Sequence, residues 1–324
     1  MHPSLVRAIL LLLPLAALSA LPAAAAPRHA SGGTPVALVT AEGQNELLAV
    51  SLPRGPILRR VRLPADPENV DVLPNGPAVV VSTKAGAVSI LAWRSLRVVK
   101  VIRGFRSPHL ASVSPDGERA YVTDDATGFL SVIELARTRV VARVFVGVGA
   151  HHLACSPDGR RIWIALGERA RTIVIVDSSH LARPKVVARF DPGFAAHDLS
   201  FSPDGSRVWV TADDSERVTL FGATSRRPVS SIAVGPPPQH VAFGARGYAY
   251  VTSGYGSRIV MANTKRVLRS ARVPYGSFNI APAGGLIVVS SLLRGTVTEL
   301  DDQLHILGTT KVAPAARDVG VSVW

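Results

Sequence analysis

The chain consists of short apolar runs, rich in β-branched and aromatic residues, that are separated by tight polar turns. In one representative stretch the runs cover residues 110–113, 120–123, 130–133 and 140–144. Runs of this length and composition, bounded by turn residues, are typical of β-strands. The pattern therefore predicts a small antiparallel sheet of four strands.

The turn between the first two strands of this unit recurs along the chain. Ser114-Pro115-Asp116-Gly117 returns as residues 156–159 and 202–205, with weaker copies at 73–76, 244–247 and 281–284. Proline sets φ at the first corner, aspartate can bond its own backbone, and glycine accepts the positive φ that follows. The spacing of about 42 residues is that of one four-stranded propeller blade.

Seven inner strands are expected, with matching positions at Val70, Ala111, Leu153, Leu199, Val241, Phe278 and Val319. The last has no room for a complete blade, whereas residues 36–40 and 47–50 match second and third strands with no first strand before them. We therefore predict an all-β, seven-bladed β-propeller over residues 35–324, with four antiparallel strands per blade. The C-terminal strand joins the N-terminal strands and closes the ring, which leaves no open sheet edge around it.

Two second strands carry a recognisable motif. Tyr121-Val122-Thr123-Asp124 and Tyr250-Val251-Thr252-Ser253 resemble the sequence that names the YVTN-type propeller repeat family. The resemblance spans nearly all of residues 35–324 and implies an exported seven-bladed propeller similar to lactonases and surface proteins. That family and its relatives include binding proteins, lactonases, lyases and electron-transfer partners. The resemblance thus implies a fold more than an activity.

The N-terminus has the layout of a secretory signal peptide: Arg7, an apolar run over residues 8–20, and small residues at 23–26. We expect a signal peptide at residues 1–25, cleaved after Ala25, and a flexible segment at 26–34; the alternative is an uncleaved N-terminal anchor. The run is too short to span a bilayer about 30 Å thick, and no second stretch could span one. An exported protein is predicted, either extracellular, associated with the cell wall or periplasmic. The lone Cys155 cannot form an internal disulfide, so stability must come from the core.

The formal net charge is +13 and the pI is about 10.9. Many basic residues fall at third-to-fourth-strand turns and on outer strands, which places them on the rim: Arg59, Arg60, Arg62, Arg97, Lys100, Arg137, Arg139, Arg143, Arg226, Arg227, Lys265, Arg266 and Arg269. Charged outer strands keep blades from pairing with other molecules. The same charges would attract an anionic cell-envelope polymer or surface, and salt would weaken that attraction.

Candidate site residues come from the positions just before each inner strand. In a propeller these positions surround the mouth of the central channel on one face. Five of the nine histidines of the chain map to this ring. The candidate ligand-binding residues are Glu68, His109, His151, His152, His197, Asp198, His240 and Asp318.

Converging imidazoles and carboxylates are compatible with three functions. His109, His151, His197 and His240 could ligate a divalent transition metal, because neutral histidine is its commonest nitrogen ligand. The same groups could serve as acid and base for a lactonase- or lyase-type enzyme. They could also line a wet, polar channel that binds a small ligand or a partner protein. We favour a monomeric, non-catalytic binding or scaffold protein, since no catalytic motif can be placed on the residues; the enzyme and the metal-binding or redox-partner propeller remain alternatives.

Overall fold

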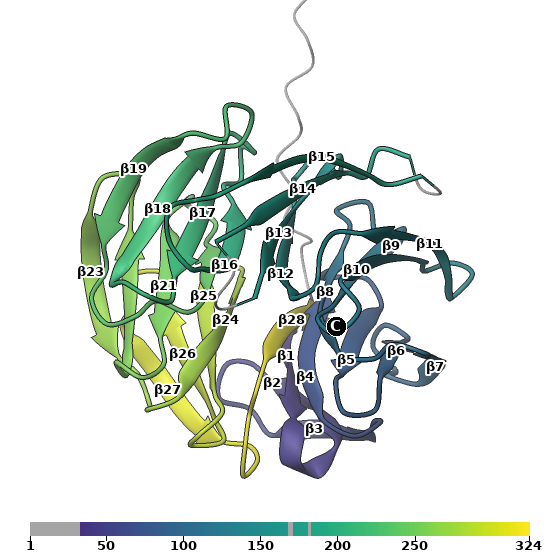
Figure 1. Ribbon diagram of the computed structural model, residues 1–324. Coiled ribbons are helices and arrows are strands. Elements are labelled where there is room, and N and C mark those ends of the chain that lie inside the picture. The colour runs from purple at the N-terminus through teal and green to yellow at the C-terminus, as the bar shows by residue number, and fades with distance from the viewer. Residues whose placement is uncertain (1–32, 168–170, 181–182) are drawn as a thin grey trace, which may run out of the picture. The chain divides into compact units, whose positions relative to one another are not determined.

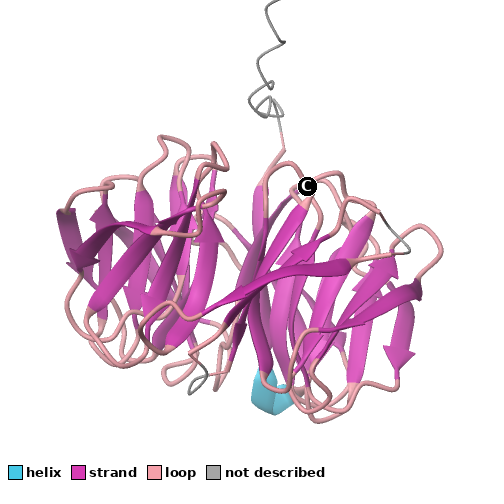
Figure 2. Ribbon diagram, turned by 45° about the horizontal axis from the view of Figure 1, so that its top comes forward, coloured by secondary structure: helices cyan, strands magenta, loops and turns pink. Residues whose placement is uncertain are grey.

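In the computed structural model, which describes residues 33–167, 171–180 and 183–324, seven sheets of four antiparallel strands are arranged in a ring (Figures 1 and 2). The predicted seven-bladed all-β propeller is confirmed. The signal peptide expected at residues 1–25, and all but the last two residues of the segment expected at 26–34, lie outside the described residues. No helix in the described ranges has the length and apolar character needed to cross a membrane.

The blades are numbered from the N-terminus, and each is given from its inner to its outer strand. Blade 1 contains β28 (Val319–Val323), β1 (Pro35–Ala41), β2 (Glu46–Ser51) and β3 (Ile57–Arg62), with a short 3-10 helix η1 (Glu42–Gln44) after β1. Blade 2 contains β4 (Pro67–Val72), β5 (Ala78–Ser82), β6 (Ala87–Leu91) and β7 (Val98–Arg103). Blade 3 contains β8 (Pro108–Val113), β9 (Arg119–Asp124), β10 (Phe129–Glu134) and β11 (Arg139–Phe145).

The remaining four blades follow the same order. Blade 4 contains β12 (Ala150–Cys155), β13 (Arg161–Leu166), β14 (Ile173–Asp177) and β15 (Lys185–Phe190). Blade 5 contains β16 (Ala196–Phe201), β17 (Arg207–Ala212), β18 (Arg217–Gly222) and β19 (Pro228–Ala233). Blade 6 contains β20 (Val241–Phe243), β21 (Ala249–Ser253), β22 (Arg258–Ala262) and β23 (Val267–Arg272), and blade 7 contains β24 (Ser277–Ala283), β25 (Leu286–Ser291), β26 (Thr296–Asp301) and β27 (Ile306–Lys311).

The recurring Ser-Pro-Asp-Gly turn joins the inner strand to the second strand through a fixed set of hydrogen bonds. In blade 3, Ser114 Oγ donates to Asp116 Oδ1 (2.5 Å) and accepts from the Arg119 N–H (3.0 Å). Gly117 has φ +74° and donates its N–H to the Ser114 carbonyl (2.8 Å). The same contacts recur after Ser156 and Ser202, so the motif serves the fold and not a site.

The core lies between blades, not within them. Each of the seven clusters of buried apolar side chains combines residues of two neighbouring blades. The largest buried side chains, Trp163, Trp209, Tyr121 and Tyr250, are at most 2% exposed, as expected for interblade core. Burying the apolar area of these clusters, which is mostly aliphatic, is the main source of stability. Each blade therefore depends on both neighbours.

Ring closure occurs as predicted. β28 pairs antiparallel with β1, with Val39 opposite Val319 and Pro35 opposite Val323. Val319 and Val321 join the apolar cluster between blades 7 and 1. The two chain segments that form blade 1 come from opposite ends of the described sequence, as the purple and yellow strands near the centre of Figure 1 show.

Blade 7 differs from the alignment of turns made on the sequence. Its first hairpin is closed by Gly284 and Gly285, both with positive φ, and Ala283 pairs with Leu286. The residue that matches Leu153 of blade 4 is therefore Ile280, and Phe278 lies two positions earlier. The sequence alignment was wrong here because it assumed a longer turn at 281–284.

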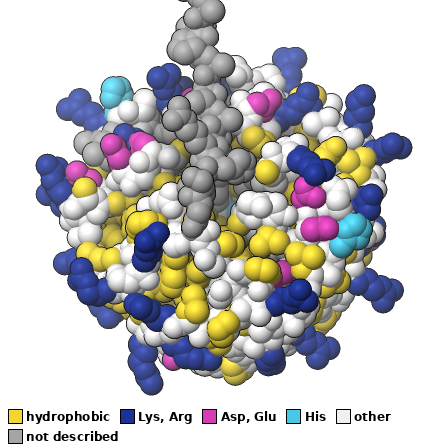
Figure 3. Space-filling view, turned by 180° about the vertical axis from the view of Figure 1, so that it is seen from behind, with side chains coloured by type: hydrophobic (Ala, Val, Ile, Leu, Met, Phe, Trp, Pro, Cys, Tyr) yellow, Lys and Arg dark blue, Asp and Glu magenta, His cyan; other side chains and the backbone are white. Residues whose placement is uncertain are grey.

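The outermost strands carry much of the positive charge. All of the outermost strands except β19 contain Lys or Arg, and Figure 3 shows Lys and Arg side chains around the perimeter of the face in view.

Candidate functional site

The inner strands begin with a β-bulge that aims two consecutive side chains at the hub. In β12, His151 and His152 stand opposite Ala165 alone, between the pairs Ala150–Leu166 and Leu153–Ile164. Consecutive residues of a regular strand point to opposite faces, whereas a bulge redirects one of them. The two imidazole centroids are consequently only 4.6 Å apart.

Register and backbone hydrogen bonds place an equivalent pair of residues in every blade. We call them the first and second bulge positions. The first bulge positions are Glu68, His109, His151, His197, Gln239, Phe278 and Arg317. The second bulge positions are Asn69, Leu110, His152, Asp198, His240, Asn279 and Asp318.

A buried threonine locks the bulge in four of the blades. Thr40, Thr123, Thr211 and Thr252 are fully buried on second strands. Thr211 Oγ1 accepts the Asp198 N–H (2.8 Å) within its blade and donates to the Gln239 carbonyl (3.0 Å) of the next blade. Equivalent donations reach the next blade from Thr123, to the His151 carbonyl (2.6 Å), and from Thr252. The threonine of the YVT sequence thus fixes the backbone from which the histidines project.

Five imidazoles form one contiguous cluster across blades 3 to 6. His109 stacks on His151 with ring centroids 3.5 Å apart and planes 13° from parallel. His152 lies at the middle of the cluster: its ring centroid is 5.1 Å from His109, 4.3 Å from His197 and 5.2 Å from His240. The prediction that these five side chains meet at the hub agrees with this geometry.

Four of the five imidazoles have a carboxylate of their own beside Nδ1. Asp125 Oδ2 is hydrogen-bonded to His151 Nδ1 at 2.9 Å. The other Nδ1–carboxylate oxygen contacts are His197–Asp213 (3.4 Å), His109–Glu68 (3.6 Å) and His240–Asp198 (3.7 Å). A histidine that ligates a metal commonly has its second ring nitrogen hydrogen-bonded to a carboxylate, as His151 has to Asp125; the other three contacts are ion-pair distances without a hydrogen bond.

Burial keeps much of the cluster neutral. The pKa values of His109, His152 and His240 lie well below the usual histidine value, chiefly because the rings are removed from water and secondly because their neighbours would repel a second positive charge. Burial also raises the pKa of Glu68. A neutral imidazole has a lone pair available for a metal ion without first losing a proton.

Asp198 and Asp318 lie deeper than the first bulge positions and connect blades. Asp198 Oδ2 accepts the Val241 N–H (3.0 Å), and Asp318 Oδ2 accepts the Val70 N–H (2.9 Å). Burial raises the pKa of Asp198 to about 6 and that of Asp318 to about 7. Of the two, Asp198 also lies beside a histidine, whereas Asp318 is separated from the imidazole cluster and hydrogen-bonds to Asn69 (2.8 Å).

Glu68 also belongs to a cluster of three acidic side chains. One oxygen each of Glu42, Asp66 and Glu68 lie within 4.8 Å of one another. Lys84 Nζ is 3.0 Å from Asp66, and Arg317 is 3.8 Å from Glu42. These cations offset the acidic charge, so the imidazole cluster is the stronger candidate site.

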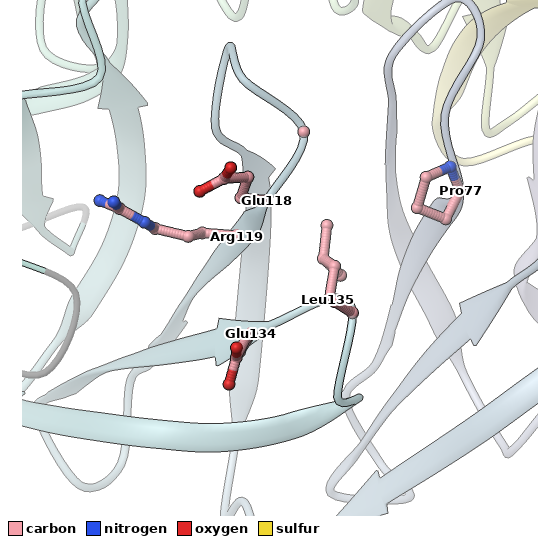
Figure 4. Close-up of a pocket in the computed structure, with 7 residues that line it drawn as sticks. Pro77, Glu118, Arg119, Glu134 and Leu135 are labelled. Carbon is pink, nitrogen blue, oxygen red and sulfur yellow. The ribbon is translucent and has the colours of Figure 1, made fainter.

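The channel below the cluster is a cavity of about 350 Å³ lined by inner-strand residues that include Asp198, His240, Asn279 and Asp318. A separate hollow of about 490 Å³ lies at the opposite end of β8, near the turn that leads into β9. Figure 4 shows Glu118, Arg119, Glu134 and Leu135 around it, with Pro77 across from them. Glu134 pairs with Arg137 (3.1 Å), and this hollow contains no histidine.

Sequence reasoning named two of the carboxylates beside the histidines, Glu68 and Asp198, but not the other two. Asp125 and Asp213 stand in the loops after second strands, where an aspartate usually caps a turn. Their neighbour Asp124 does cap its loop, since it accepts the Arg106 and Ser107 N–H groups (2.8 and 3.2 Å). The available signal was the equal offset of Asp125 and Asp213 from the threonines Thr123 and Thr211.

Cys155 is not part of the site. It lies at the far end of β12 from His151, and burial raises the pKa of its thiol to about 12. A thiol with that pKa is protonated at neutral pH and is a poor nucleophile or metal ligand. It packs as a small apolar group.

Comparison with known proteins shows the fold alone. No protein family model and no curated protein sequence matches the chain. Among solved structures, the chain is similar to a protein of unknown function from Desulfotomaculum acetoxidans (TM-score 0.79, 14% identity, covering 89% of this chain and 98% of that one). It is also similar to apo AztD from Citrobacter koseri (0.71, 12%, 90% and 99%) and to virginiamycin B lyase from Staphylococcus aureus (0.64, 12%, 76% and 84%). These structures share the propeller, and the chain is a seven-bladed β-propeller with a histidine cluster at its hub.

Proposed function

We propose that the hub binds a divalent transition-metal ion through imidazole nitrogens, and that the protein is a metal-binding propeller exported from the cytoplasm. The supporting observation is the pairing of four clustered histidines with four separate carboxylates, at 2.9 to 3.7 Å from Nδ1. In His151, where Asp125 is hydrogen-bonded to Nδ1, Nε2 is the nitrogen left for an ion. Export is inferred from residues 1–25, and the YVTN-type resemblance of the repeats is in keeping with it.

The donor set favours a particular class of ion. Imidazole suits Zn²⁺, Cu²⁺ and Ni²⁺, whereas Mg²⁺ and Ca²⁺ prefer all-oxygen sites. Two groups of three histidines, His109, His151 and His152 or His152, His197 and His240, have ligand atoms within 4.8 Å of one another. Three protein ligands leave an open position for water or for a ligand exchanged with a partner.

Partial exposure of the cluster fits a binding role. The side chains of His109, His151, His197 and His240 are 10 to 19% exposed, so the site is open to solvent but largely enclosed. An ion can therefore enter without unfolding of a blade. The function proposed for the hub is to hold such an ion, and it needs no catalytic group.

Metal analysis of the purified protein tests this proposal. We expect stoichiometric Zn²⁺ or Cu²⁺ after incubation and dialysis, and its loss when His151 and His197 are both replaced by alanine. Binding should raise the unfolding temperature, since an ion at 100 times its Kd stabilises the native state by about 2.7 kcal/mol.

His305→Gln is the matched control. His305 also has a carboxylate beside Nδ1, Asp301 at 2.8 Å, but it is exposed and stands outside the cluster. This variant should retain full binding. Absence of stoichiometric metal in the unaltered protein, or equal binding in the double alanine variant, would refute the proposal.

A further inference from the structure

His152 differs from the other four clustered histidines. It is 4% exposed, and its Nδ1 is buried with no hydrogen-bond partner, which is also true of Nδ1 of His197. Among the described residues no carboxylate forms an ion-pair contact with it, although each of the other four has one. A buried ring nitrogen without a partner is costly, and a bound ion would satisfy it.

The same residue belongs to both groups of three histidines. His109 and His151 form a stacked pair with centroids 3.5 Å apart, and His197 and His240 form a second pair at 5.7 Å. The centroid of His152 is 4.6 Å from the nearer ring of the first pair and 4.3 Å from the nearer ring of the second. An imidazole has two nitrogens that point in different directions, so one ring can face two ions.

The carboxylates divide in the same way. Glu68 and Asp125 accompany His109 and His151, while Asp213 and Asp198 accompany His197 and His240. Each half of the cluster therefore carries two acidic groups that can offset one divalent charge. Arg317 stands at a first bulge position, and its positive charge contributes to lowering the pKa of His109 and of His240. Its pairing with Glu42 partly screens its charge from the cluster.

We propose that the hub holds two divalent transition-metal ions bridged by the imidazole ring of His152. One ion is bound by His109 and His151, and the other by His197 and His240. This inference rests on the proposed metal-binding function. When the second ion binds, the remaining ring proton of His152 passes to solvent, so that each nitrogen forms one bond to one ion and no redox change occurs.

Titration of the full-length protein with Cu²⁺, followed by elemental analysis and electron paramagnetic resonance, tests the proposal. We expect two equivalents bound. Two Cu²⁺ ions joined through one imidazolate couple magnetically, so the signal at two equivalents should be lower than the signal at one. This readout needs no variant and does not depend on a substitution being tolerated.

Variants locate the two ions. His109→Gln should remove one equivalent and leave the His152, His197 and His240 site, and His240→Gln should remove the other equivalent. Either variant should show an uncoupled signal from its single Cu²⁺, while His305→Gln should behave as the unaltered protein.

The outcomes separate this inference from the function beneath it. One equivalent in the unaltered protein would overturn the bridged pair and leave metal binding intact. Two equivalents with an undiminished signal would overturn the bridge. No bound Cu²⁺ and no bound Zn²⁺ would overturn both proposals together.

Discussion

At the scale of single residues, the carboxylates beside the histidines determine how well the hub can hold an ion. Asp125 is the clearest case, because it makes the shortest contact, 2.9 Å to His151 Nδ1. A carboxylate at this place fixes the ring orientation and raises the basicity of the opposite nitrogen.

Asp125→Asn should therefore weaken metal affinity by about 10- to 100-fold, the usual effect of removing such a partner. Competition with a chromophoric chelator measures the change. Asp301→Asn, at the isolated His305 pair, is the control and should have no effect. Unchanged affinity in Asp125→Asn would mean that His151 does not bind the ion.

Asp318 makes stability depend on pH. Burial raises its pKa to about 7 in the folded protein, whereas an unfolded aspartate has a pKa of about 3.9. The folded state therefore holds the proton more tightly, and this contribution to stability is fully present below about pH 4 and is lost as pH rises through about 7. In Asp318→Asn, the free energy of unfolding should fall less between pH 5 and pH 7.5, by up to a few kcal/mol.

Urea unfolding at several pH values measures how steeply the free energy of unfolding changes with pH. Asp204→Asn provides the contrast. The Ser202 hydroxyl lowers the pKa of Asp204, so this carboxylate changes the free energy of unfolding only below about pH 4. An identical slope between pH 5 and pH 7.5 in the unaltered protein and in Asp318→Asn would contradict the prediction.

At the scale of elements, the buried second-strand threonines Thr123, Thr211 and Thr252 couple one blade to the next. Thr211→Val keeps the shape of the side chain but removes the hydroxyl that serves the Asp198 N–H and the Gln239 carbonyl. We expect a loss of about 1–3 kcal/mol in the free energy of unfolding, since the buried Asp198 N–H and the half-buried Gln239 carbonyl both lose their partner.

Thr123→Val should show a second effect. Its hydroxyl donates to the His151 carbonyl, so metal affinity should fall as well as stability. Thr40→Val, in blade 1, is the matched control that should lower stability alone. Equal metal affinity in all three variants would show that the bulge backbone does not position the histidines.

The elements were largely predictable because their signals are local. Proline, aspartate and glycine define the hairpin at Ser114, and the apolar runs beside it define the strands. The bulge was not predictable, because it depends on a register shift between strands, and alternation alone would place His151 and His152 on opposite faces. The pairing of Asp125 and Asp213 with histidines was missed because it follows from three-dimensional packing: Asp125 contacts His151 of the next blade, and Asp213 contacts His197 across its own blade.

At the scale of the whole molecule, the propeller is held closed by one strand. Removing residues 318–324 would delete β28, leave β1 with an unpaired edge and take Val319 and Val321 out of a core cluster. An exposed edge of this kind promotes aggregation. We expect the truncated chain to lose its cooperative thermal transition and to elute as aggregates in size-exclusion chromatography.

A milder variant separates pairing from packing. With Val319 and Val321 both replaced by alanine, β28 can still pair with β1, so the protein should elute as the unaltered chain does and unfold at a lower temperature. A truncated chain that unfolds like the full-length protein would show that closure by β28 is dispensable.

The repetition of the two bulge positions has an evolutionary consequence. Apart from the loop carboxylates, the side chains proposed to bind or support the metal ions occupy the first or second bulge position of their blade. The hydrogen bonds that hold the bulge come largely from backbone and threonine groups. Substitution at Phe278, Gln239 or Leu110 can therefore add a metal-binding side chain without altering the backbone of the propeller. Propellers that share this backbone can therefore diverge in the ligand they bind within a few mutations, long before the fold changes.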